Sequence, residues 1–145
     1  TSGVLALSGD DNYPYAVPVS YAYDGYKLYF HCAKSGHQID AIRRNAKASF
    51  CVIDQDLVVP EEYTSYFRSI IAFGTIRILE DSQEKREAIE KLAVKYAPDD
   101  NDAHRQAAID RDWVPLCMLE MTIEHMTGKE AKELIKEKQQ RNKSC

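Results

Sequence analysis

Residues 13–32, which read YPYAVPVSYAYDGYKLYFHC, constrain the fold more than any other segment. In residues 13–23 every second residue is a tyrosine or a valine, and this period of two is the pattern of a β-strand. Asp24 and Gly25 follow, and a second strand-like run comes directly after them. Asp-Gly between two such runs is a strong signal of a β-hairpin. We therefore expect a sheet built from antiparallel neighbours.

The rest of the chain adds strands and a few helices to this hairpin. Strand patterns are found in residues 3–7, 47–54, 66–79 and 114–126, and helical patterns in 36–44 and 80–98, with room for a short helix in 99–112. Residues 55–65 are expected to form a loop, and Gly74 to mark a bulge or bend. Thr127 and Glu130 form a capping box that predicts a C-terminal helix and fraying tail over about 128–145.

This order of elements has neither a βαβ alternation nor a glycine-rich dinucleotide motif. We therefore expect a mainly β protein: a single domain over residues 1–145, folded as a closed or nearly closed barrel of mostly antiparallel strands with three to four peripheral helices.

Composition excludes several classes of function. A net charge of −4 argues against a general nucleic-acid binder, and no apolar run is long enough to cross a membrane. The four cysteines are scattered and form no C-x-x-C pair, so we expect reduced thiols in a cytoplasmic protein. The histidines and cysteines show no metal-ligand spacing, and no metal is expected.

The segment FHCAKSGHQIDAIRRN, residues 30–45, leads from a strand end into a helix and is the main candidate site. Ser35 and Gln38 form a capping box at the expected helix start. A helix N-terminus offers free N–H groups and a partial positive charge, Lys34 adds a cation, and Gly36 lets a ligand approach the backbone. His37 in the first turn is unfavourable unless an anion compensates it. The corner is therefore either a phosphate site or an ordinary basic turn.

These segments resemble the flavin-binding split-barrel proteins related to pyridoxamine 5'-phosphate oxidase, and most closely their nitroimidazole-resistance branch. The resemblance rests on a P-x-x-V-P-x-x-Y strand, a D-G-x-x-x-Y-F-H hairpin return, and a corner that reads Ala33, Lys34, Gly36, His37, Ile42 and Asn45. Matching segments continue through EEYTSYFRSIIAFGTIRIL to TGK, so that residues 3–130 are covered.

The resemblance implies a homodimer with FMN, or FAD, at the interface. Matched by position, the backbone of Pro18, Val19 and Ser20 would lie along the flavin ring. The ribityl chain and phosphate would be surrounded by His31, Cys32, Ala33, Lys34, Gly36 and His37. Ser69 and Ile70 would complete the site, from the partner subunit.

The same resemblance implies an oxidoreductase that reduces nitroimidazoles or other small acceptors. His31 and Trp113 are the candidates for residues near the substrate. Oxidation of pyridoxamine phosphate itself is not expected, because no second basic set for a substrate phosphate can be placed. Two alternatives remain: a non-catalytic flavin-binding or sensor protein, and a haem-binding relative with His31, His37, His104 or His125 as ligand.

Overall fold

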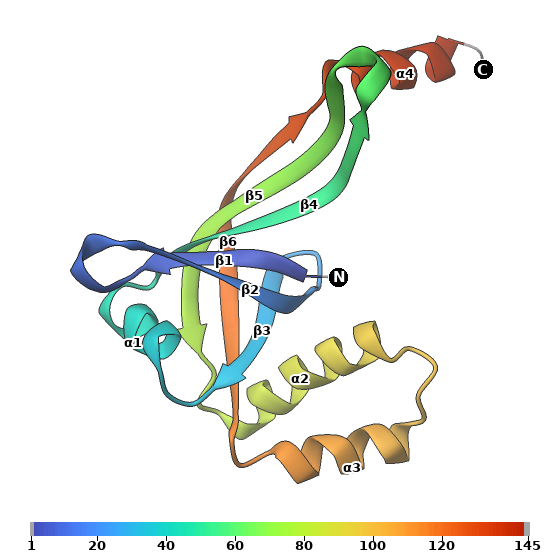
Figure 1. Ribbon diagram of the computed structural model, residues 1–145. Helices are drawn as coiled ribbons and strands as arrows, with labels where there is room; N and C mark the ends of the chain where they lie inside the picture. The colour runs from blue at the N-terminus through green and yellow to red at the C-terminus, as the bar shows by residue number, and fades with distance from the viewer. Residues whose placement is uncertain (1, 144–145) are drawn as a thin grey trace.

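The computed structural model describes residues 2–143 and is built around an antiparallel barrel (Figure 1). Six strands close in the order β1-β2-β3-β6-β5-β4. Their bounds are β1 Ser2–Ser8, β2 Pro14–Tyr23, β3 Lys27–Ala33, β4 Lys47–Val59, β5 Thr64–Ile78 and β6 Leu116–Glu130. The expected hairpin is present: the Asp24 carboxylate accepts hydrogen bonds from the N–H groups of Tyr26 and Lys27 and so fixes the turn. The predicted mainly β split barrel is confirmed.

Large apolar side chains fill the barrel, and a short helix closes one end. Phe30, Phe50 and Leu119 are at most 1% exposed, and the rings of Phe30 and Phe50 meet edge to face at 5.0 Å. Helix α1 (His37–Arg44) buries Ile39 and Ile42 against this core. Burial of each such side chain contributes roughly 1.5–3 kcal/mol to stability. The helix that follows the corner is therefore anchored by the barrel interior.

Two further helices cover the outside of the barrel below β3 (Figure 1). Helix α2 (Ser82–Tyr96) packs Ala88 and Leu92 against Tyr29 and Met118 in a second apolar cluster. Helix α3 (Asp102–Asp112) is a full 11-residue helix, capped by Asn101. It is longer than the short helix that its acidic sequence indicated. None of the helices described within residues 2–143 is long and apolar enough to cross a membrane.

Strands β4, β5 and β6 continue beyond the barrel as a three-stranded arm (Figure 1). The expected loop over residues 55–65 is wrong, because Asp56 pairs with Phe67 and the ladder runs on to Val59 opposite Thr64. Only the 3₁₀ turn Pro60–Glu62 and Tyr63 separate the two strands. The polar residues at 54–56 break the apolar pattern, but pairing with β5 keeps this segment in a strand.

The prediction that Thr127 and Glu130 form a capping box is also wrong. Both residues belong to β6, where Thr127 pairs with Ile71 and Glu130 with Arg68. The C-terminal helix α4 begins at Lys132 and runs to Lys143 at the far end of the arm, so the expected fraying tail is helical as far as it is described. Residues 144–145 of that tail lie outside the described part of the chain.

One β-bulge interrupts the ladder between β5 and β6, at the position that Gly74 indicated. Phe73 pairs with His125 and Gly74 pairs with Ile123, so Glu124 has no partner on β5. A Cβ atom on Gly74 would lie 2.0 Å from the Thr122 carbonyl oxygen, which only glycine avoids. The bulge therefore shifts the inward-facing positions of β6 by one residue. After Ile123, the next side chain that lines the barrel mouth is Met126 and not residue 125.

Candidate functional site

The barrel opens between β2 and β3, and the predicted ring-binding residues lie at this opening. The two strands pair only through Tyr21–Tyr23 and Leu28–Phe30. Beyond the last pair, Pro18, Val19 and Ser20 continue on β2 with only β1 beside them, while His31, Cys32 and Ala33 continue on β3 beside β6. A proline is tolerated in such a segment because one of its sides has no ladder. The two predicted groups thus occupy the two sides of one split.

The corner after β3 is built by a glycine rather than by a capping side chain. Gly36 is the N-cap of α1, with φ 118° and ψ 176°, and no side chain caps the helix. The predicted capping box of Ser35 and Gln38 is therefore wrong, and the Gln38 Nε2 atom is buried without a partner. Since no side chain occupies the helix start, its first N–H groups are available to a ligand.

His37 is turned toward an acidic side chain. Its Nδ1 lies 3.1 Å from Oδ2 of Asp10, in the turn between β1 and β2, and Asp10 also forms an ion pair with Arg44. Arg44, and after it His37, hold the pKa of Asp10 below its usual value. The predicted role of His37 at a phosphate stays a prediction, and an anion at the corner would share His37 with Asp10.

Lys34 and a second lysine, Lys85 on α2, are the cations at this corner that lack an acid. Among the described residues no carboxylate pairs with either of them. Lys85 is only 8% exposed, and its Nζ donates to the Trp113 carbonyl oxygen at 3.0 Å and lies 4.1 Å from the centre of the Trp113 ring. Burial, and after it the charge of nearby Lys34, lower the pKa of Lys85. An anion here would relieve an unfavourable arrangement of charge.

Lys85 was not among the site residues predicted from the sequence, although a signal was present. Lys85, Ala88 and Leu92 have the i, i+3, i+7 spacing of one helix face, and this is the face that α2 buries. A lysine on the apolar stripe of a helix is unusual and marks either a paired charge or a functional one.

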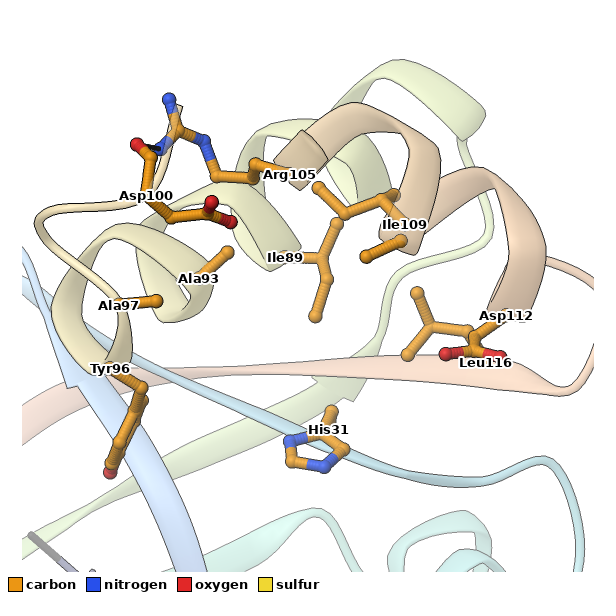
Figure 2. A pocket seen from close by; sticks show the side chains of 11 residues that line it. His31, Ile89, Ala93, Tyr96, Ala97, Asp100, Arg105, Ile109, Asp112 and Leu116 are labelled. Atoms are coloured by element: carbon orange, nitrogen blue, oxygen red, sulfur yellow. Dashed lines mark hydrogen bonds between the residues drawn. The ribbon is translucent and has the colours of Figure 1, made fainter. Parts of the chain in front are cut away.

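The two candidates for substrate contact have different surroundings. His31 lies on a cavity between β3, α2 and α3, shown in Figure 2. The Trp113 ring lies near two cations, with the Lys85 ammonium 4.1 Å and the Arg86 guanidinium 4.6 Å from its centre. Cys32 is not a nucleophile at neutral pH, since burial, and after it its neighbour Cys117, raise its thiol pKa to about 12.

Ser69 and Ile70 do not belong to the corner of their own chain. They lie on β5, where Ser69 pairs with Lys129 and Ile70 with Gly128, and Ile70 lines the mouth of the barrel. Their predicted contribution to the site from a partner subunit stays a prediction.

The fold is thus a split antiparallel barrel, and near the end of β3 it carries two lysines, Lys34 and Lys85, that pair with no carboxylate among the described residues. The chain belongs to the pyridoxamine 5'-phosphate oxidase family, since the family model of that description matches residues 1–130. The resemblance seen in the motifs is thereby confirmed. No curated protein matches the chain.

Solved structures with the same fold show 20–22% sequence identity in the three examples that follow. A candidate 5-nitroimidazole antibiotic resistance protein from Bacteroides thetaiotaomicron has a TM-score of 0.71 and 22% identity, over 88% of this chain and 75% of the other. The FAD and heme binding protein from Mycobacterium smegmatis has a TM-score of 0.70 and 20% identity, over 90% and 65%. An FAD-binding protein from Mesorhizobium loti has a TM-score of 0.65 and 22% identity, over 90% and 86%.

Proposed function

We propose that the protein binds FMN and acts as an oxidoreductase that reduces a small acceptor. The observation that carries the proposal is the uncapped helix start at Gly36, which Lys34 precedes by two residues, together with buried Lys85, whose pKa the charge of Lys34 helps to lower. Neither lysine pairs with a carboxylate among the described residues. A flavin phosphate would supply the missing negative charge. Family membership, and the FAD binding of two proteins with the same fold, support a flavin. FAD is the alternative cofactor, because its first phosphate would use the same corner.

The chain's residues would bind and orient the cofactor, which supplies the electron-transfer chemistry when bound. Lys34, Lys85 and the N–H groups after Gly36 would hold the phosphate. The strand segment Pro18–Ser20 would present its backbone to the ring across the split. In the cytoplasm, where we propose that the protein works, reduced nicotinamide coenzymes would supply the electrons.

The first experiment is the absorption spectrum of the purified protein, with the released chromophore identified by mass. We expect a flavin spectrum and the mass of FMN. A colourless protein that fails to take up added FMN would overturn the proposal. A haem band instead would favour the haem-binding alternative. Of its four candidate ligands, His31 forms no hydrogen bond through its imidazole with any described residue, whereas His37 and His104 contact Asp10 and Asp100.

The phosphate site is tested by comparing FMN with riboflavin, which lacks the phosphate. Lys34→Met removes one charge-assisted contact of roughly 1.5–3 kcal/mol, so FMN affinity should fall about 10- to 100-fold. Riboflavin affinity should not change. Lys136→Met, at an exposed helical position of α4, is the matched control and should leave both affinities unchanged. Equal losses for FMN and riboflavin would contradict a phosphate contact.

Turnover separates the oxidoreductase from a sensor. Reduced flavin in the protein should be reoxidised anaerobically by a nitroimidazole or another small acceptor, and NADH or NADPH should sustain the cycle. Tight flavin binding without reoxidation by any acceptor would favour the non-catalytic alternative.

We also propose that the chain forms a homodimer through the arm. The neighbouring residues Leu57 and Val58 point to opposite faces of β4, and they are 54% and 66% exposed. Ile53 and Met126 are also more than half exposed. An apolar ribbon with both faces uncovered is typical of an interface. A second copy would also bring its Ser69 and Ile70 to a site that one chain leaves incomplete.

A further inference from the structure

A separate cavity lies between α2, α3 and the outer face of the barrel (Figure 2). Its volume is about 370 Å³. Ile89 and Ala93 of α2 form one wall, Ala108 and Ile109 of α3 form the other, and His31 and Leu116 form the floor. The walls carry small or aliphatic side chains, and the floor joins the split through His31 on β3.

A polar clamp on the outer side holds the two helices at this spacing. Arg86 of α2 donates to Gln106 at 3.0 Å and to Asp110 at 2.6 Å on α3. Gln106 in turn donates to Glu90 at 2.6 Å. These bonds tie α2 to α3 at this spacing and oppose a closer approach of the two helices that would fill the gap. The cavity is therefore part of the fold's geometry rather than a loose contact.

The charged groups at the rim are already committed to one another. Arg105 pairs with Asp102 and donates to the Asp100 carbonyl oxygen at 3.3 Å, while His104 contacts the Asp100 carboxylate at 2.9 Å. Asp112 pairs with Arg111, which lowers the pKa of Asp112. Among the described residues, none forms a hydrogen bond with the His31 imidazole. The cavity is also lined by Tyr96, whose hydroxyl is hydrogen-bonded to the Tyr21 backbone. A ligand would thus meet aliphatic walls, the committed Tyr96 ring and the His31 imidazole, which is open to a hydrogen bond.

These features select a class of ligand. A volume of 370 Å³ is at the small end of ligand pockets, which suits one or two rings and not a nucleotide. A charged ligand would lose its hydration without gaining a counter-ion, since every rim charge has a partner. We propose that this cavity binds a small uncharged aromatic molecule with one hydrogen-bonding group directed at His31, and that it is the acceptor pocket of the flavin site. The assignment as acceptor pocket rests on the proposed function, whereas the binding of a small uncharged aromatic molecule does not.

The test uses the whole chain without added cofactor and indole as the probe, because indole is uncharged, has two rings and carries one N–H donor. Binding is measured by calorimetry, with benzoate as an anionic comparison. We expect saturable indole binding and at least tenfold weaker benzoate binding. Absence of saturable indole binding would overturn the proposal, and equal binding of benzoate would overturn the assignment to uncharged ligands.

Two variants locate the binding in the cavity. Ala108→Phe fills it, and indole affinity should fall at least tenfold. Ala107→Phe places the same ring on the exposed side of α3 and should change affinity less than twofold. If Ala108→Phe does not fold, Ala93→Leu fills the cavity from α2 and should have the same effect. Unchanged binding in a folded, filled variant would contradict the assignment.

The role in turnover is tested last, with flavin-loaded protein, where indole should compete with the acceptor. Indole binding in a protein that takes up no flavin would support the ligand assigned to the cavity and contradict the proposed function. Flavin binding with no indole binding would support the proposed function and contradict the ligand assigned to the cavity.

Discussion

Gly36 gives the corner a backbone conformation that other residues adopt only with strain. Its φ of 118° and ψ of 176° belong to a region that is essentially restricted to glycine, although a Cβ atom there would meet nothing within 4 Å. The strain of a substitution is therefore a backbone effect and not a steric clash.

Gly36→Ala should lower the free energy of unfolding by about 1–3 kcal/mol. Urea denaturation measures the change. Ser35→Ala is the control and should be close to neutral, because Ser35 caps no helix. A large loss for Ser35→Ala together with a neutral Gly36→Ala would mean that the serine, and not the glycine, builds the corner.

Cys32 should make stability depend on pH at the alkaline end. Its thiol stays protonated in the folded chain because its pKa is raised from 9.0 to about 12, whereas the unfolded chain releases the proton near pH 9. The folded state then holds more protons, so stability falls as pH rises between these values, at up to about 1.4 kcal/mol per pH unit.

Cys32→Ala removes this group, and the fall in stability between pH 9 and pH 11 should become shallower. The slopes of chemical-denaturation stability against pH give the comparison, since the cavity left by the substitution affects both ends alike. Parallel slopes in the two proteins would show that other groups cause the alkaline loss.

At the scale of elements, two of the three lysines in helix α2 have opposite expected effects on stability. Lys85 is buried without an acid, while Lys91 forms an ion pair with Asp24 at 2.6 Å and donates to the Tyr29 hydroxyl at 2.9 Å. A buried, uncompensated charge destabilises the folded state, and a paired one that is replaced leaves its partner unsatisfied.

Lys85→Met should therefore leave the protein at least as stable and weaken FMN binding about tenfold, while Lys91→Met should destabilise it by about 1–3 kcal/mol. Thermal unfolding and flavin titration measure the two effects. Loss of stability in Lys85→Met with unchanged FMN affinity would mean that the Lys85 amine stabilises the fold through Trp113 and does not contact the phosphate.

The elements also show which parts of the fold the sequence predicts. The hairpin at Asp24 and helix α1 were correct because their signals are local: an Asp-Gly turn, a period of two, and two isoleucines three residues apart. The arm was missed because the polar residues at 54–56 interrupt the apolar alternation, and residues 55–59 become a strand only through pairing with β5 across the short turn at 60–63. Thr127 and Glu130 have a capping pattern, but β5 holds them in β6.

The candidate site divides in the same way. Pro18 and Lys34 could be placed at one opening because they flank a hairpin that the sequence defines. Lys85 and the cavity between α2 and α3 could not, because they arise where separate elements meet. The contact between His37 and Asp10 likewise joins two turns that are 27 residues apart.

At the scale of the whole molecule, the proposed dimer can be tested at the arm. Val58→Asp places a charge on its exposed apolar surface and should weaken dimerisation at least tenfold, measured by sedimentation over a range of protein concentrations. FMN affinity should fall with it, because Ser69 and Ile70 of the second copy are lost. Val114→Asp, at a position 76% exposed beyond α3, is the control. A monomeric wild-type chain that binds FMN fully would contradict the proposed dimer.

The bulge at Glu124 shifts the alternation of inward and outward side chains by one residue between the two halves of β6. Residues 117–123 face inward at odd numbers, and Met126 faces inward at an even one. One unpaired residue thus decides which side of the arm looks toward the barrel mouth. Deleting Glu124 would leave the barrel register intact and turn the outer part of β6 over, so that His125 and Thr127 exchanged sides with Met126 and Gly128. The loss of one codon would in this way give the same barrel an arm with a different exposed surface.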